Sequence, residues 1–264
     1  MALLHVDFFS DVLGMCVEMD VILPENTVGQ IGMEGKSGPD KWKTLYLLHG
    51  MSDDHTIWQR RTSIERYVAD KGIAVVMPST QLGWYTDMYE GMKWYTYIAE
   101  ELPRICRSFF PNMSDKREDT FVCGLSMGGY GAFKLALRAS ETFGWGASLS
   151  GALDVEQLVR WGGLGNPSYW TDVFGPADEI KDGFNDLFKA ASDLKENGKP
   201  IPKLYMWCGE QDFLFSHNER MDKHLTELGI EHVYEKSPGD HQWKYWDEKV
   251  QTVLSWLLEN KEGK

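Results

Sequence analysis

A serine lies between two glycines in Gly124-Leu125-Ser126-Met127-Gly128, which matches the pattern G-x-S-x-G. An apolar run, residues 120–123, precedes this segment, and a helix-forming run, residues 130–139, follows it. Glycines around the serine let the chain turn sharply from a strand into a helix, which would expose the Ser126 hydroxyl above the edge of a sheet. The pattern in this context therefore predicts that Ser126 is a nucleophile.

A serine hydroxyl is a weak nucleophile at neutral pH and needs a histidine base, oriented in turn by an acid. In the chain order that goes with this pattern, the acid and then the histidine follow the serine. His217 and His224 fall in a charged helical stretch, which indicates a solvated face, and His232 falls in an alternating strand. His241 lies in a loop between the predicted last strand and the last helix, so we expect it to be the general base.

The expected acid is Asp212, which follows directly after the apolar run of residues 204–207. Because parallel strands end at one edge of a sheet, Asp212 should emerge at the same edge as Ser126. Asp154 and Asp240 remain competitors, and helix N-capping is the ordinary structural role for any of the three.

A second donor for an oxyanion should come from the loop His49-Gly50-Met51-Ser52, which follows the apolar run of residues 44–48. We expect the backbone N–H groups of Met51 and Met127 to form the oxyanion hole, with Gly50 as the alternative to Met51. His49 precedes the nucleophile in the chain, which favours a structural hydrogen-bonding role for it.

Short apolar runs alternate with helical patterns over most of the chain. Strands are expected at residues 44–48, 73–77, 120–123, 204–207 and 231–236, and helices at 58–71, 93–110, 127–139, 218–228 and 243–259. This alternation predicts an α/β fold with a mostly parallel central sheet and helices on both faces. Residues 3–9 and 15–23 predict an antiparallel hairpin at the sheet edge. Pro103 should kink or break its helix near Leu102.

Two segments lack this regular pattern. Residues 24–43 are rich in Gly, Lys, Asp and Pro and predict a solvated loop. Residues 152–202 form an insertion between two core strands, with several aromatic residues. Such an insertion usually folds over the ligand end of the sheet as a cap, although a surface excursion with no role in binding is the alternative.

The composition excludes several partner classes. The chain has 264 residues and a formal net charge of −13, which argues against nucleic acid or an anionic membrane as a partner. No stretch approaches the roughly 18 apolar residues that a membrane span needs, and the N-terminus lacks the basic start of a secretion signal, so a cytoplasmic protein is expected. The four cysteines are expected to be small core residues.

Aromatic residues make up 13% of the chain, more than a core of this size ordinarily uses. We expect Trp84, Tyr85, Trp161, Trp170 and Trp243 to contribute walls of a substrate pocket, where aromatic faces could stack on a sugar ring or a cinnamoyl group. Ordinary core packing is the alternative for each of them.

Several motifs together resemble one known family. Residues 47–51, 83–87, 97–103, 124–131, 208–213 and 239–243 are similar to the esterase D family of α/β-hydrolases, and most of all to the bacterial tributyrin esterases. The resemblance covers nearly the whole chain from Thr44 to the final helix. It implies a single α/β-hydrolase domain over residues 1–264, with a cap-like insertion at about 152–202.

The same resemblance implies a serine carboxylesterase that hydrolyses short-chain acyl esters through an acyl-enzyme, with Ser126, Asp212 and His241 as its triad. It implies no cofactor and no metal. The expected partner is a small-molecule ester, with acetyl or feruloyl esters of carbohydrates among the candidates, and a homo-oligomer is left open. The alternatives are an acyltransferase of the same fold, a thioesterase like the S-formylglutathione hydrolases, and a non-catalytic sugar-binding protein on a hydrolase scaffold.

Overall fold

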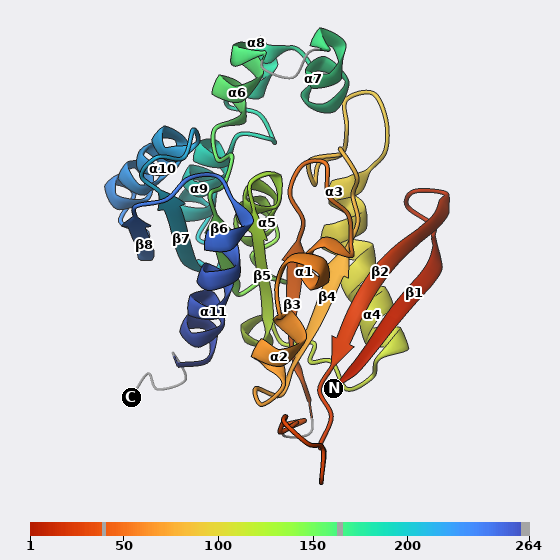
Figure 1. Cartoon of the computed structure of the whole chain (residues 1–264). Helices are drawn as coiled ribbons and strands as arrows, with labels where there is room; N and C mark the ends of the chain where they lie inside the picture. Colours follow the sequence, from red (N-terminus) through yellow and green to blue (C-terminus); the bar gives the residue numbers. More distant parts are fainter. Residues whose placement is uncertain (39–40, 163–165, 260–264) are drawn as a thin grey trace.

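The computed structural model describes residues 1–38, 41–162 and 166–259, and their strands form one eight-stranded sheet in the order β1-β2-β4-β3-β5-β6-β7-β8 (Figure 1). The strands are β1 (Ala2–Ser10), β2 (Met15–Leu23), β3 (Lys43–Leu48), β4 (Ile73–Pro78), β5 (Thr120–Leu125), β6 (Trp145–Leu149), β7 (Lys203–Gly209) and β8 (His232–Ser237). β1 pairs antiparallel with β2 and β2 with β4, whereas all pairs from β4 to β8 are parallel. The predicted sheet with its antiparallel N-terminal hairpin is confirmed.

Helices cover both faces of this sheet. They are α1 (Ile57–Arg61), α2 (Ile64–Val68), α3 (Trp94–Thr96), α4 (Leu102–Phe109), α5 (Met127–Arg138), α6 (Val155–Trp161), α7 (Pro167–Phe174), α8 (Ala177–Ile180), α9 (Leu187–Glu196), α10 (Phe215–Glu227) and α11 (Trp243–Glu259). Alternate residues of β3 divide between two hydrophobic clusters: Leu45 and Leu47 pack with α1, α2 and α11, while Tyr46 and Leu48 pack with α4, α5, α9 and α10. Burial on both faces explains the continuous apolar runs of the parallel strands.

Two predicted helices are interrupted. The helix expected at 58–71 is divided into α1 and α2, because Thr62 is extended and its hydroxyl accepts a hydrogen bond from the Ile64 N–H at 3.1 Å. The helix expected at 93–110 contains a π-helical turn, Tyr97–Glu101, directly before α4. Pro103 at the start of α4 lacks the N–H that a regular helix would use, so the irregular turn falls close to the expected break.

β6 was not predicted as a strand. Its sequence Trp-Gly-Ala-Ser-Leu contains one large aliphatic residue and none that is β-branched, so local propensity gives little signal. All five residues are nevertheless buried, because the strand lies between β5 and β7.

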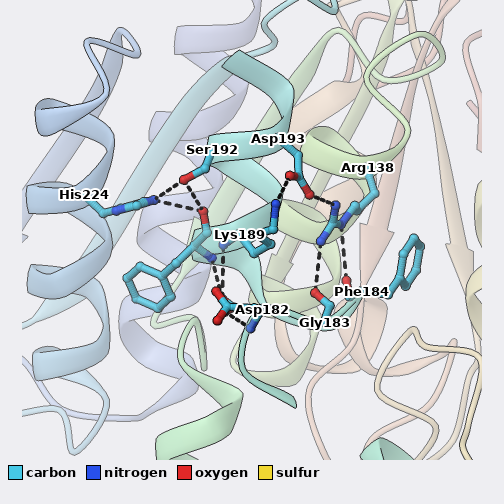
Figure 2. Close-up of polar contacts among 10 residues, drawn as sticks. Arg138, Asp182, Gly183, Phe184, Lys189, Ser192, Asp193 and His224 are labelled. Atoms are coloured by element: carbon cyan, nitrogen blue, oxygen red, sulfur yellow. Dashed lines mark hydrogen bonds and ion pairs between the residues drawn. The ribbon is translucent and has the colours of Figure 1, made fainter. Parts of the chain in front are cut away.

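The insertion (residues 152–202, between β6 and β7) carries α6 to α9, and α6, α7 and α8 stand at the top of Figure 1, beyond the end of the sheet. Its second half is tied to α5 by Arg138, as Figure 2 shows. The Arg138 guanidinium donates to the backbone oxygens of Gly183 and Phe184 at 3.1 and 3.2 Å and to the Asp193 carboxylate at 2.7 Å. On the other side, the His224 ring on α10 contacts the Phe188 oxygen at 2.9 Å. The C-terminal half of the insertion is therefore anchored to two core helices.

A buried lysine joins the insertion to a second loop. The Lys134 ammonium on α5 donates to the Thr86 hydroxyl and to the Asn185 side-chain oxygen, both at 2.6 Å, and the Tyr95 and Tyr130 rings lie beside it. Burial lowers the Lys134 pKa well below its ordinary value. Through this contact the loop that carries Trp84 and the insertion that carries Trp170 are fastened to the same helix.

No helix within the described ranges is long and apolar enough to cross a membrane. Of the four cysteines, which are all free thiols, Cys106, Cys123 and Cys208 are buried as expected. Cys16 is exposed instead, because β2 turns this side chain away from the core.

We predict that Arg138→Met lowers the free energy of unfolding by about 2 kcal/mol, because the largely buried Arg138 side chain makes three hydrogen bonds that join the insertion to α5 and methionine can make none of them. Urea unfolding measures the change. Arg160→Met is the matched control, since Arg160 is half exposed and its ion pairs with Glu156 and Asp178 lie at the surface. Equal effects of the two substitutions would contradict the anchoring role.

Candidate active site

The chain turns from β5 into α5 at Ser126, whose backbone has φ +54° and ψ −116°. This left-handed conformation is rare for a residue with a side chain and must be held by its surroundings. The Ser126 N–H donates to the Leu149 oxygen at 2.9 Å, and the Ser126 oxygen accepts from Ala152 N–H at 3.1 Å. The ends of β6 and of the segment after it thus hold the serine in the exposed position that the sequence pattern predicted.

Glycines permit the tight packing around this turn. A Cβ atom on Gly128 would lie 2.5 Å from the His49 oxygen, and one on Gly124 would lie 2.3 Å from the Gly128 oxygen. Neither distance is compatible with a side chain. The two flanking glycines of the G-x-S-x-G pattern therefore let α5 approach both β5 and the loop after β3.

Ser126, His241 and Asp212 form one chain of hydrogen bonds. The Ser126 hydroxyl lies 3.0 Å from His241 Nε2, and His241 Nδ1 lies 2.8 and 3.0 Å from the two carboxylate oxygens of Asp212. The carboxylate at Nδ1 places the hydrogen on that nitrogen, which leaves Nε2 as an acceptor for the serine proton. This geometry has the nucleophile, base and orienting acid that acyl transfer requires.

The loops that carry the acid and the histidine are tied to each other. Gln211 N–H donates to the Gly239 oxygen at 2.9 Å, and Gly239 N–H donates to the Gln211 side-chain oxygen at 2.7 Å. The Asp212 carboxylate also accepts from Leu214 N–H at 2.9 Å and is fully buried. The spacing between Asp212 and His241 is therefore set by the backbone of both loops.

Aromatic rings enclose the histidine. The Phe213 ring lies 4.6 Å and the Trp246 ring 4.8 Å from the His241 ring, measured between centroids. Trp246 is itself held by a hydrogen bond from its Nε1 to the Ser150 hydroxyl at 3.1 Å. These contacts restrict rotation of the imidazole, so its Nε2 stays directed at Ser126.

The expected oxyanion donors lie at the mouth of the same turn. Neither Met51 N–H nor Met127 N–H has a hydrogen-bond partner within the part of the chain that the structure describes, so both are available to a ligand. The Asp53 carboxylate lies beside Gly50, which stays the alternative to Met51 as the second donor. Burial is the main cause of a raised pKa at Asp53.

His49 supports the oxyanion loop from below. Its Nδ1 lies 2.8 Å from the Gly50 oxygen, and its Nε2 accepts a hydrogen bond from Thr80 N–H at 3.0 Å. The Tyr85 hydroxyl donates to the His49 backbone oxygen at 2.9 Å. Burial lowers the His49 pKa to about 4, so the ring is neutral near pH 7. The expected structural role of this histidine agrees with these contacts.

A cavity of about 400 Å³ opens beside Ser126 and His241, and its walls are mostly apolar. Three of the five aromatic residues expected in the pocket line it, namely Trp84, Trp161 and Trp170. Tyr85 is fully buried beneath the oxyanion loop, and Trp243 packs edge-on against Trp58 and Trp246. Neither Tyr85 nor Trp243 is among the described residues that line the cavity.

The competing aspartates have other partners. Asp154 caps the N-terminus of α6 by accepting from Gln157 N–H at 3.0 Å and forms an ion pair with Arg220. Asp240 pairs with the amide of its neighbour Gln242 at 2.8 Å. His217 differs from expectation: it is buried rather than solvated, because it faces the segment around Asp154 and not the outer face of α10.

Other residues of the cavity were not expected. Phe213, Leu158 and Ala152 line it together with Met51 and Leu214. Phe213 directly follows the predicted acid Asp212 in the sequence, and this adjacency could have been used to predict that Phe213 lies near the active site. Leu158 looks like any apolar residue of an amphipathic helix, and nothing in the sequence sets it apart. Within residues 1–38, 41–162 and 166–259, no group of three or more His, Cys, Asp or Glu side chains could hold a metal ion.

Acid is predicted to destabilise the protein through His49. Its pKa is about 4 in the folded protein and about 6.5 in an unfolded chain, so between these values only the unfolded chain binds the proton. The free energy of unfolding should therefore fall by about 2 kcal/mol between about pH 7 and pH 5 from this residue alone. Urea unfolding at both pH values measures this, and His49→Gln should show a smaller fall. Equal falls in both proteins would count against the assignment.

Comparison with known proteins agrees with this geometry. The chain matches the Esterase family over residues 10–257. An acetyl esterase of Caldicellulosiruptor saccharolyticus is 30% identical over 263 residues, which is 97% of this chain and 98% of the relative.

Two solved structures from Staphylococcus aureus are similar at 32% identity, each covering 97% of this chain and 98% of the other. The fluorophosphonate-binding serine hydrolase F has a TM-score of 0.87, and an S-formylglutathione hydrolase has a TM-score of 0.85. Because the family match spans nearly the whole chain, the protein belongs to the Esterase family, and it is a carboxylic ester hydrolase with the α/β-hydrolase fold.

Proposed function

We propose that Ser126, His241 and Asp212 are the catalytic triad of an esterase that hydrolyses short-chain acyl esters, acetyl esters foremost. The observation that carries this proposal is the hydrogen-bond chain from Ser126 through His241 to Asp212 at the edge of the apolar cavity. Similarity to an acetyl esterase supports the acetyl group, and the resemblance to tributyrin esterases supports short acyl chains in general.

The reaction proceeds in two acyl-transfer steps. His241 Nε2 takes the Ser126 proton as the serine oxygen attacks the ester carbonyl, and the N–H groups of Met51 and Met127 stabilise the oxyanion. His241 then gives this proton to the departing alcohol oxygen, which leaves an acyl-serine. Water, deprotonated by His241, attacks the acyl-serine carbonyl. The bond to the serine oxygen then breaks, the acid is released, and His241 returns the proton to the Ser126 oxygen. Asp212 stabilises the imidazolium in both steps.

The insertion serves as the cap of this site. Its residues Leu158, Trp161 and Trp170 contribute one wall of the cavity, while Trp84 and Phe213 contribute walls from loops at the sheet edge. These apolar walls provide the binding surface for the apolar parts of the ester.

Ser126→Ala is predicted to lower kcat/KM on p-nitrophenyl acetate by at least about 10³-fold, because the acyl-enzyme can no longer form. Labelling by a fluorophosphonate probe should be lost with it. Circular dichroism and urea unfolding check that the variant folds. A folded Ser126→Ala protein that retains activity would falsify the assignment of the nucleophile.

Asp212→Asn is predicted to lower kcat by up to about 10⁴-fold, because an amide can neither hold His241 in the required tautomer nor stabilise the imidazolium. Asp70→Asn is the control, since Asp70 is exposed and distant from the triad in the fold. The kcat of both variants on p-nitrophenyl acetate decides the point. If kcat of Asp212→Asn were within tenfold of the parent value, Asp212 would not be the orienting acid, and Asp154 and Asp240 would become the candidates for that role.

A further inference from the structure

A second hollow lies next to the catalytic cavity. This side groove has a volume of about 330 Å³ and shares Leu158, Trp161, Phe213 and Leu214 with the catalytic cavity. Beyond these shared residues it is lined by three polar side chains, Gln157, Ser216 and His217. Trp84 and Trp170 line the catalytic cavity and not the side groove.

The proposed mechanism decides which part of the substrate lies on the groove side. His241 Nε2 must reach the alcohol oxygen to protonate it, whereas the carbonyl oxygen points at the Met51 and Met127 N–H groups. The alcohol therefore leaves along the His241 side of the cavity. Phe213, which lies against the His241 ring, is also a wall of the side groove, so the groove continues the path of the alcohol.

The aromatic entrance of the groove suits a flat, partly apolar body. The Trp161 and Phe213 side chains are 67% and 63% exposed, which is unusual for such large rings beside an active site. A sugar ring has apolar faces that pack on aromatic rings and hydroxyls at its rim. The volume of the groove is at the lower end of the range for small-ligand pockets, enough for one such ring.

Two side chains of the groove lining carry a hydrogen-bond donor that has no partner among the described residues. His217 is only 6% exposed, and its Nδ1 accepts from Asp154 N–H at 3.4 Å, which places its hydrogen on Nε2. Nε2 has no partner among the residues that the structure describes. The Gln157 oxygen accepts from Arg220 at 3.4 Å, which leaves its amide nitrogen likewise without a described partner. Both groups can donate to hydroxyl oxygens.

No described residue of the groove carries a charge near pH 7. Lysine, arginine, aspartate and glutamate are missing from its described lining, and burial lowers the pKa of His217, which keeps the ring neutral. The neighbouring Arg220 is already paired with the Asp154 carboxylate. A leaving group with free carboxylates, such as the tripeptide glutathione, would find no unpaired cation here.

We propose that the side groove is the leaving-group subsite and that it binds a neutral, hydroxyl-bearing alcohol of about one sugar ring, through His217 Nε2 and the Gln157 amide. This inference rests on the proposed esterase function. The lining of the side groove determines the leaving-group specificity and favours a neutral alcohol over an anionic thiol.

The test compares three substrates that share one acyl group: p-nitrophenyl acetate, an acetylated methyl xyloside and S-acetylglutathione. In Gln157→Leu and in His217→Phe, the ratio of kcat/KM on the xyloside to kcat/KM on p-nitrophenyl acetate should fall about tenfold, as expected for one lost hydrogen bond. Gln251→Leu, an exposed glutamine on α11, should leave all three values unchanged. Gln157 is on the surface, so its variant remains informative if His217→Phe does not fold.

A charge added to the groove tests the neutral character of the subsite. Ser216→Arg should raise kcat/KM on S-acetylglutathione about fivefold relative to p-nitrophenyl acetate, since an unpaired cation is then available to a carboxylate. Unchanged substrate ratios in Gln157→Leu and Ser216→Arg would overturn the subsite. An equal loss on the xyloside and on S-acetylglutathione in Gln157→Leu would overturn its preference for neutral alcohols. A parent protein inactive on p-nitrophenyl acetate would overturn the proposed function itself.

Discussion

The site depends on one strained residue at the junction of β5 and α5. The backbone of Ser126 lies in the left-handed region, a conformation that costs on the order of 1–3 kcal/mol for a residue with a side chain. Hydrogen bonds to Leu149 and Ala152 hold it there, and Gly124 and Gly128 remove the side chains that would otherwise collide. Because β6 and the start of the insertion supply these bonds, Ser126, the proposed nucleophile, is positioned only in the assembled sheet.

Much of this arrangement could be predicted from the sequence. The parallel strands are buried on both faces, so they read as unbroken apolar runs, and the order of Ser126, Asp212 and His241 follows from where those strands end. His49 could be separated from the catalytic base because it precedes the nucleophile. These predictions need only that the fold brings the carboxyl ends of its strands to one edge, whatever the details of packing.

Other features of the fold and the site could not be predicted, because they depend on tertiary contacts that produce no periodic hydrophobic pattern in the sequence. β6 is buried by its position between two strands rather than by β-branched residues, and Thr62 divides a helix through two hydrogen bonds of its side chain. Tyr85 and Trp161 look alike in the sequence, yet one is buried under the oxyanion loop and the other stands exposed at the cavity. His217 is buried because α10 turns it toward Asp154, which helical spacing alone could not reveal.

The insertion is fastened at its C-terminal half, through Arg138, Lys134 and His224, while its first half stands at the cavity. The proposed triad comes from residues that follow β5, β7 and β8, outside the insertion. Val173 and Phe174 of α7 belong to the buried core, so the freedom to vary is confined to exposed and cavity-lining positions of α6 and α7. Substitutions there allow new substrate ranges to evolve while the chemistry is retained. Directed evolution of these two helices should therefore change the substrate range without changing the reacting groups.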